Sequence, residues 1–341
     1  MSRPSLVALG STLDDLREAA RAADAAGFES VWAAEFYDRS ATIALAAMAE
    51  ATGGVGGRIE LGSGIMYGFG RVPLVLAAEA RDLDSLSGGR LILGLGTGTR
   101  RMMQGWHGLD GLHPAPRLEE LVPLLRRLWR LHEGPIKHEG RFYTLDITPT
   151  APPAKPLRVD IPVYLAGVNP RMCEATGAVA DGLVGHPIFT RRYVEEVVRP
   201  ALAKGAAKTG RDVDVPIAGY LICAIDDDGD RARMDAAAQI AFYSTVKSYD
   251  RIHQLHGFED ATAAIRERWR SGDLAGMVGA VSPAMVEAMA VAGTPAEVRD
   301  QAAGWKGVYE RPLLYPPSIG GGKRTAETVA RITETFAGID L

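Results

Sequence analysis

The sequence predicts an α/β protein, a (β/α)8 TIM barrel with insertions at its C-terminal face. Short apolar runs rich in Val, Ile, Leu and Gly alternate with longer segments of helical periodicity along the 341 residues. Eight such strand–helix units can be placed in order, the number that makes up this type of barrel. Two of the runs, residues 59–66 and 90–98, flank a helical segment that Pro73 opens. This strand–helix–strand unit requires a parallel sheet.

The eight predicted strands are short apolar runs bounded by turn residues, at residues 5–10, 30–35, 59–66, 90–98, 161–167, 182–187, 215–225 and 311–315. The helices predicted between and after them span residues 13–26, 41–52, 74–86, 118–132, 169–180, 191–209 and 325–337. Gly27 suits the position just after the first helix, where a left-handed residue commonly ends a helix. Thr294 predicts a further helix, because Pro295 and Glu297 complete a capping box with it.

Three segments interrupt this alternation and are predicted to be insertions in a single domain, residues 1–341. Residues 99–116 are rich in Gly, His and Pro and are expected to form a loop. Residues 134–158 include a predicted β-hairpin that turns at Glu139–Gly140, and residues 246–290 lie in an Ala-rich helical region without a predicted strand. The alternative fold is an open doubly wound sheet. The motif GLGTGT lacks the third glycine and the later acidic residue of a dinucleotide fingerprint, so it supports that alternative only weakly.

The composition excludes several classes of function. The chain has 38 basic and 42 acidic residues and a formal charge of −4, so no excess of positive charge is present to bind nucleic acid. No apolar run reaches the roughly 18 residues that a membrane-spanning helix needs. The two cysteines, Cys173 and Cys223, lie far apart, which argues against a disulfide framework or a cysteine-based zinc site. We therefore expect a cytoplasmic protein with a small-molecule substrate and no metal.

Candidate site residues lie where predicted strands end, because α/β folds bind ligands at the carboxyl ends of their strands. Gly64 and the pair Thr97–Gly98 leave room for a ligand against the backbone, although glycines there can also serve only to make tight turns. Glu35 can act as an acid or base or accept a hydrogen bond from a cofactor. The alternative role for Glu35 is an ion pair with Arg71 or Arg100.

The segment Gly167–Val168–Asn169 joins a strand to a helix and is a candidate anion site, with Asn169 as a ligand or simply as the helix N-cap. Arg171 can add positive charge there. His186 ends a strand and can donate a proton or line a pocket, but a lone histidine can also be structural. Four other histidines are not assigned a function. The spacing of His107 and His113 does not suggest a metal site, and His253 and His256 are expected to be solvated.

Two long motifs carry a resemblance to a known family. The first is GFESVWAAE, followed by RIELGSGIMYGFGRVPLVLAAEARDLDSLSGGRLILGLGTGTRRM and a tryptophan, and the second is VYLAGVNPRMCEATGAVADG. In these motifs the chain resembles the luciferase-like monooxygenase family over nearly its whole length. The resemblance implies a (β/α)8 barrel that binds FMN or the deazaflavin coenzyme F420 at the carboxyl end. The chain is most similar to the F420-dependent branch, to which methylenetetrahydromethanopterin reductase belongs.

The resemblance also implies roles for individual positions. Gly64–Ile65 matches a pair that forms a non-prolyl cis peptide behind the ring, and Thr97–Gly98 matches backbone contacts to the cofactor. Gly167–Val168–Asn169 matches the phosphate loop, and Glu35 an acidic residue near the ring. The chain departs from the sugar-phosphate dehydrogenase of the branch at three positions: Phe36 replaces a histidine, Thr99 a glutamate, and Phe189 lies near the place of a lysine. These replacements favour a less charged substrate.

The predicted activity is therefore hydride transfer between the deazaflavin C5 and a small, weakly charged carbonyl, imine or activated alkene. Glu35 and His186 are the catalytic candidates, and the pocket walls are predicted to be Phe36, Tyr37, Tyr67 and Trp106. One alternative is an FMN-dependent monooxygenase, and another is a barrel that binds a flavin or lipid without turnover. We also expect a homodimer that pairs through the helices at residues 41–52 and 74–86.

Overall fold

The computed structural model describes residues 2–319 and 322–341. Contacts between Cα atoms group the chain into two compact units. The first comprises Met1–Val31, Gly185–Pro200 and Pro216–Leu341, and the second comprises Trp32–Val184 and Ala201–Val215. The single domain expected from the sequence stays a prediction. All eight predicted strands are present within the described ranges, with boundaries shifted by a few residues.

The second unit is built on parallel strands that neighbour one another in the order β3, β5, β8 and β9. These strands are β3 (Glu60–Ser63), β5 (Leu91–Gly96), β8 (Val163–Ala166) and β9 (Gly182–Val184). The register pairs Leu93 with Val163 and Leu95 with Leu165. β5 is buried along its whole length, as its continuous apolar sequence predicts for a strand covered on both faces. The short strand β4 (Met66–Tyr67) pairs with the carboxyl end of β5, so the single strand predicted at residues 59–66 is in fact divided between β3 and β4.

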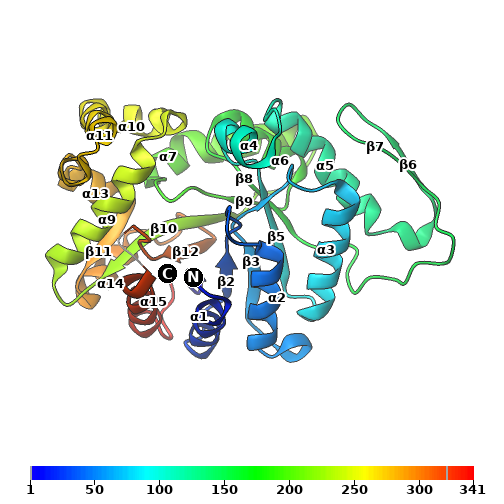
Figure 1. Cartoon of the computed structure of the whole chain (residues 1–341), viewed down its shortest axis with the longest axis horizontal. Helices are drawn as coiled ribbons and strands as arrows, with labels where there is room; N and C mark the ends of the chain where they lie inside the picture. The colour runs from blue at the N-terminus through cyan, green and yellow to red at the C-terminus, as the bar shows by residue number, and fades with distance from the viewer. Residues whose placement is uncertain (1, 320–321) are drawn as a thin grey trace. The chain divides into compact units, whose positions relative to one another are not determined.

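Helices cover these strands. They are α2 (Ala41–Ala51), α3 (Pro73–Leu86), α4 (Arg100–His107), α5 (Pro114–Leu128) and α6 (Pro170–Val179). The helices α2 and α3 pack on each other, α2 against β3 and α3 against β5 (Figure 1). The α2 face that turns inward is made mainly of alanines, whose small side chains allow this close approach. The indole N–H of Trp129, just after α5, donates to the carbonyl of Ala77 at 3.1 Å and ties α5 to α3.

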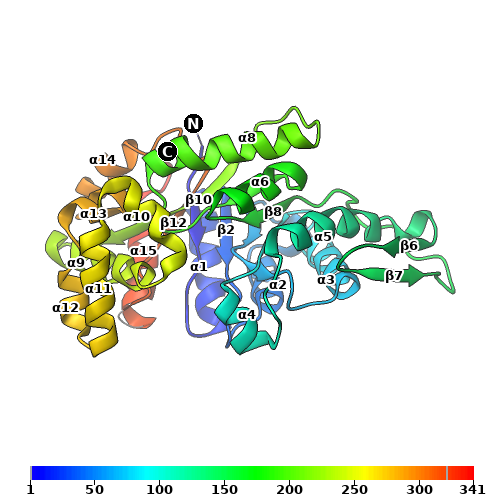
Figure 2. The same ribbon diagram turned by 90° about the horizontal axis from the view of Figure 1, so that it is seen from above.

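The prediction that residues 99–116 form a loop is wrong for much of that segment. Residues 100–107 form α4, because Thr99 caps it by accepting a hydrogen bond from the N–H of Met102, and Gly108 ends it with a φ of +66°. The hairpin expected in residues 134–158 is confirmed as β6 (Ile136–Glu139) paired with β7 (Thr144–Ile147), and it extends beyond α5 (Figure 2).

The first unit has parallel strands in the order β11, β10, β12 and β1. They are β1 (Ser5–Val7), β10 (Ile217–Ile225), β11 (Ala290–Gly293) and β12 (Arg311–Tyr315). β12 pairs with the first half of β10, whereas β11 pairs with its carboxyl half. β11 was not predicted, because its sequence AVAG continues the Ala-rich pattern of the helix before it. β2 (Ser30–Ala33) begins in the first unit and ends in the second.

The segment predicted as an insertion, residues 246–290, is part of the first unit and contains α10 to α13. The helices of this unit are α1 (Leu13–Ala25), α7 (Arg191–Tyr193), α9 (Gly229–Ser244), α10 (Asp250–His256), α11 (Glu259–Ser271), α12 (Leu274–Gly279), α13 (Pro283–Met289), α14 (Pro295–Ala303) and α15 (Gly322–Thr335). A π-helical turn, Val194–Val198, leads from α7 into α8 (Arg199–Lys208), so residues 191–208 are continuously helical, nearly as predicted. The predicted capping box at Thr294 is also present.

The inserted helices α11, α12 and α13 pack against α9 (Figure 2). Their packing corrects one expectation: His253 of α10 is 1% exposed, so the prediction that it is solvated is wrong. His256 is half-buried, and its Nε2 lies 2.7 Å from the hydroxyl of Thr190. Within the part of the chain that the structure describes, the helices are too short or too polar to cross a membrane.

Candidate active site

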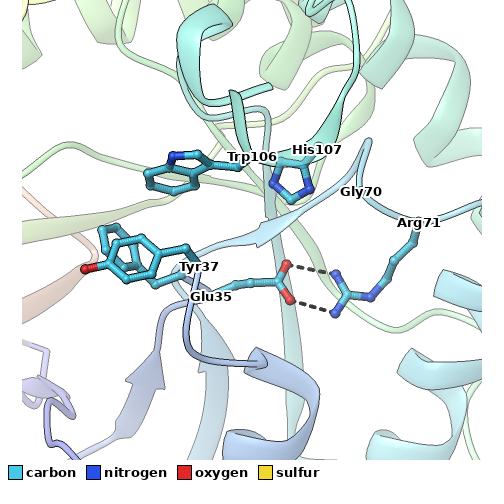
Figure 3. A pocket seen from close by; sticks show the side chains of 7 residues that line it. Glu35, Tyr37, Gly70, Arg71, Trp106 and His107 are labelled. Carbon is cyan, nitrogen blue, oxygen red and sulfur yellow. Dashed lines mark hydrogen bonds and ion pairs between the residues drawn. The ribbon is translucent and has the colours of Figure 1, made fainter. Parts of the chain in front are cut away.

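A cavity of about 460 Å³ opens in the second unit, beyond the carboxyl ends of the strands (Figure 3). This volume lies in the range of small-molecule sites. It is lined by residues from the segment after β2, the segment after β4 and the last turn of α4, namely Glu35, Phe36, Tyr37, Gly70, Arg71, Trp106 and His107. Four of the predicted site residues, Glu35, Phe36, Tyr37 and Trp106, thus line one cavity, because parallel strands bring their carboxyl ends to the same edge of the sheet.

Glu35 forms a bidentate ion pair with Arg71. Arg71 donates from Nη1 to Oε2 at 2.8 Å and from Nη2 to Oε1 at 2.6 Å, and the backbone N–H of Tyr67 donates to Oε2 at 2.9 Å (Figure 3). The alternative role considered for Glu35, an ion pair with Arg71, is therefore confirmed. Arg71 also contacts Glu79 through Nε at 2.7 Å.

This network decides the charge of Glu35. Burial raises the pKa of its carboxyl group, but the hydrogen bonds from Arg71 and Tyr67 outweigh burial and leave the pKa below its ordinary value. Glu35 is thus an anion at neutral pH. It can orient its neighbours or accept a hydrogen bond, and it can donate a proton only if Arg71 moves away.

Three aromatic side chains form the other wall of the cavity. Phe36, Tyr37 and Trp106 are 45%, 72% and 41% exposed, although such rings are normally buried. The ring of Phe36 lies 4.4 Å from that of Tyr37 and 5.1 Å from that of Trp106. Tyr67, predicted as a fourth wall residue, is 3% exposed and does not line the cavity; its ring lies 6.4 Å from that of Trp106. An exposed aromatic cluster beside a cavity is typical of a surface that binds an apolar ligand.

His107 also lines the cavity and was not predicted as a functional residue. Its ring packs 4.8 Å from that of Tyr67, and its buried Nε2 has no hydrogen-bond partner among the described residues. Gly70 leaves room for the ring, since a Cβ atom at position 70 would lie 3.2 Å from Nδ1. The sequence reasoning missed His107 because it placed the residue in a loop, whereas the last turn of α4 presents it to the cavity.

The glycines that end the strands have a structural role of their own. The Gly64–Ile65 peptide bond is cis, which confirms the prediction. The N–H of Gly64 donates to the carbonyl of Ala33 at 2.9 Å, and the side chain of Ile65 packs on Gly96, where a Cβ would lie 2.7 Å from Cδ1. Gly98 has a φ of +60°, and the hydroxyl of Thr97 donates to its carbonyl at 3.0 Å. Glycine at positions 96 and 98 is thus required by packing and backbone conformation even without a ligand.

The predicted phosphate loop lies at the start of α6, with Asn169 at the N-cap position. Asn169 is thus the N-cap residue, one of the two roles considered for it, although its side chain accepts no hydrogen bond from the first turn. Its backbone carbonyl instead accepts from the N–H groups of Met172 and Cys173. Gly167 approaches the helix closely, because a Cβ there would lie 3.2 Å from the nitrogen of Cys173, and the carbonyl of Val168 faces the Cys173 thiol at 3.9 Å. Helix N-termini with this geometry favour anions.

Arg171, which was expected to add charge at this loop, is already paired. It donates two hydrogen bonds of 2.7 Å to the carboxylate of Glu119. The hydrogen bonding to Glu119 raises the pKa of the Arg171 guanidinium above its ordinary value. An anion at the start of α6 would therefore rely first on backbone N–H groups and on Asn169.

His186 belongs to the first unit and is not among the residues that line the cavity of the second unit. Its ring lies 4.8 Å from that of Tyr243 and 4.1 Å from that of Tyr249, and its Nδ1 accepts a hydrogen bond from the N–H of Ile188 at 3.4 Å. Burial, and then the neighbouring His253, lower the pKa of His186 to about 3, so the imidazole is neutral at physiological pH.

Two of the three departures from the sugar-phosphate dehydrogenase pattern have structural explanations. Thr99 is the N-cap of α4. Phe189 is fully buried and packs against Tyr193, so it presents no group to a ligand. Phe36 alone of the three reaches the cavity.

Comparison with known proteins identifies relatives that match most of the chain. The model of the luciferase-like monooxygenase family matches residues 2–309. An uncharacterized protein of Mycobacterium tuberculosis (strain ATCC 25618 / H37Rv) is 37% identical over 80% of this chain and 83% of that protein. The 5,10-methylenetetrahydromethanopterin reductase of Methanopyrus kandleri is 28% identical over 81% of this chain and 80% of that enzyme.

A solved structure shows the same fold. The coenzyme F420-dependent tetrahydromethanopterin reductase from Methanopyrus kandleri matches with a TM-score of 0.79 and 25% identity, covering 97% of this chain and 98% of that one. This match confirms the (β/α)8 barrel that the sequence predicts. Because the family model spans most of the chain, the protein belongs to the luciferase-like monooxygenase family.

Proposed function

We propose that the protein is a coenzyme F420-dependent oxidoreductase that transfers a hydride between the deazaflavin C5 and a small, weakly charged organic substrate. The proposed reacting group is a carbonyl, an imine or an activated alkene. The observation that carries the substrate class is the charge balance of the cavity. Its carboxylate, Glu35, and its guanidinium, Arg71, bond to each other, and the remaining side chains of the lining are three aromatic rings and the imidazole of His107. Such a lining offers no uncompensated charge to a strongly charged substrate.

Support for F420 as the cofactor comes from the relatives. The Methanopyrus kandleri protein is named as a reductase, and its solved structure is described as F420-dependent. FMN is the alternative cofactor, because the family is described as monooxygenases and that chemistry needs a flavin that reacts with oxygen. Under that alternative the protein would be an FMN-dependent monooxygenase.

The residues of the second unit fit a cofactor that carries a flat ring system and a phosphate group. The N-terminus of α6, with Gly167, Val168 and Asn169 at its N-cap position, would hold the phosphate. Ile65 and the backbone of Thr97–Gly98 would support the ring. A bound deazaflavin would supply the carbon that gives or takes the hydride.

The chain itself would position the substrate and keep water away. The rings of Phe36, Tyr37 and Trp106 provide apolar surface that a substrate can cover, and covering it excludes water from the cavity. Glu35 fixes the segment after β4, because it bonds both Arg71 and the N–H of Tyr67. We assign Glu35 this positioning role, and the catalytic role expected for His186, which does not line this cavity, stays a prediction.

Stopped-flow absorbance tests the proposal. The purified protein is mixed with reduced F420 and a panel of neutral carbonyl compounds, imines and activated alkenes, with sugar phosphates as charged comparators. We expect oxidation of the cofactor with neutral compounds and none with sugar phosphates. Oxidation that occurs only with reduced FMN and oxygen would replace the proposal with the monooxygenase alternative.

A further inference from the structure

A chain of hydrogen bonds in the first unit ends at a tyrosine beside His186. It runs from Gln239 through Ser318 and Tyr315 to Tyr243. The N–H of Ser318 donates to Oε1 of Gln239 at 2.8 Å. Because a backbone N–H can only donate, the atom that it meets must be the amide oxygen, which fixes the orientation of the Gln239 amide.

This fixed acceptor determines the direction of every other bond in the chain. The hydroxyl of Ser318 lies 3.1 Å from the same oxygen and donates its single proton to it. Ser318 must then accept from Tyr315, at 3.4 Å, the longest link. The proton of Tyr315 is thereby used, so Tyr315 must accept from Tyr243 at 3.1 Å. The hydroxyl proton of Tyr243 therefore points into the chain, and its oxygen presents lone pairs to any further partner.

The neighbouring His186 presents the opposite kind of group. Its Nδ1 accepts from the N–H of Ile188, so the proton of the neutral ring resides on Nε2. Within the described residues Nε2 makes no hydrogen bond, and the side chain is partly exposed, as is that of Tyr243. The rings of His186 and Tyr243 lie 4.8 Å apart and meet at 76°. The ring of Tyr249 also packs against that of His186, at 4.1 Å.

We propose that His186 and Tyr243 form a binding subsite for a ligand group that accepts and donates a hydrogen bond at once, such as a hydroxyl or a secondary amide. Nε2–H of His186 donates to the ligand, and the oxygen of Tyr243 accepts from it. A ketone can accept the hydrogen bond from His186, but it has no proton to donate to the oxygen of Tyr243. The subsite does not depend on which cofactor the second unit binds.

The matched ligands cyclohexanol and cyclohexanone test this assignment. NMR of protein labelled with ¹⁵N in histidine reports both the tautomer of His186 and its shift during titration with each ligand. We expect the proton on Nε2 and tighter binding of cyclohexanol. Tyr243→Phe should weaken cyclohexanol binding by about fivefold, the effect of one neutral hydrogen bond. It should leave cyclohexanone binding unchanged.

Two further variants separate the subsite from general damage. Tyr249→Phe is the matched control, because Tyr249 also packs on His186 but its hydroxyl makes no hydrogen bond to the described residues. It should change neither affinity. Tyr315→Phe frees the hydroxyl of Tyr243 to donate, so cyclohexanone should bind more tightly while cyclohexanol keeps its affinity. A proton on Nδ1 of His186, equal losses for both ligands in Tyr243→Phe, or the same loss in Tyr249→Phe would overturn the proposal.

Discussion

Removal of the Arg71 side chain tests how the candidate site is held together. Glu35 and Arg71 are 10% and 15% exposed and approach to 2.6 Å, so Arg71→Met leaves a carboxylate largely buried without its charged partner. Breaking a buried pair on one side costs about 3–5 kcal/mol. Glu35 keeps the N–H of Tyr67, and we therefore expect a loss of about 2–4 kcal/mol in the free energy of unfolding at pH 7.

The stability lost in Arg71→Met should also depend on pH in a definite direction. In the wild type the pKa of Glu35 is lowered, so the pair stabilises the fold above the ordinary value of 4.5, and this stability is lost as pH falls through the folded pKa. In Arg71→Met burial raises the pKa of Glu35, and protonation then relieves the unpaired charge. The difference between wild type and variant should therefore be largest near neutral pH and shrink as pH falls below 4.5.

Urea denaturation at several pH values measures both effects. Arg17→Met is the matched control, because Arg17 and Asp14 also approach to 2.6 Å but are 36% and 81% exposed. This control should change stability by less than about 0.5 kcal/mol. The double variant Glu35→Gln, Arg71→Met should recover part of the loss. A loss no greater than that of Arg17→Met, or one that grows at acid pH, would refute the reasoning.

Three further predictions concern the phosphate loop, His186 and the assembly. Asn169→Ala should weaken F420 binding by about 1–2 kcal/mol in a titration, because the variant loses one hydrogen bond to the charged phosphate; unchanged affinity would remove Asn169 from the site. The pKa of His186 is about 3 and lies below its ordinary value of 6.5, so its neutral form should stabilise the fold above 6.5 and lose that contribution as pH falls toward 3, which His186→Gln should abolish in denaturation experiments. The exposed apolar side chains Ile43, Leu74 and Val75 on α2 and α3 suit a two-fold interface, so light scattering should show a dimer that Val75→Asp weakens; a wild-type monomer at micromolar concentration would contradict this.

Much of the fold could be predicted because burial imposes a regular pattern on the sequence. Strands such as β5 are continuously apolar, and helix ends such as Thr294 carry their own capping residues. The helix α4 was missed because it is short and stands among glycines, histidines and prolines that indicate a loop. β11 was missed because its pairing with β10, far away in sequence, makes the short segment AVAG a strand.

Candidate site residues could be predicted from the sequence where they follow the end of a strand. Their side-chain partners and their burial could not be predicted, because these depend on contacts between segments far apart in the chain. The ends of strands located Glu35, Gly64 and Asn169. From the sequence, the ion-pair partner of Glu35 could be either Arg71 or Arg100. Arg71 is the partner because the segment after β4 folds back toward Glu35. The burial of His253 and the exposure of His107 to the cavity depend on the packing of short helices, and the sequence of one short helix does not contain that information.

The central claim, that this member of the family uses F420, is tested most directly by measuring the binding of both cofactors to the same purified protein. Oxidised F420 and FMN are titrated separately, binding is followed by the absorbance or fluorescence of each cofactor, and Asn169→Ala serves as the comparison variant. The account predicts that F420 binds more tightly than FMN and that the variant weakens F420 binding. Tight binding of FMN together with no detectable binding of F420 would contradict it.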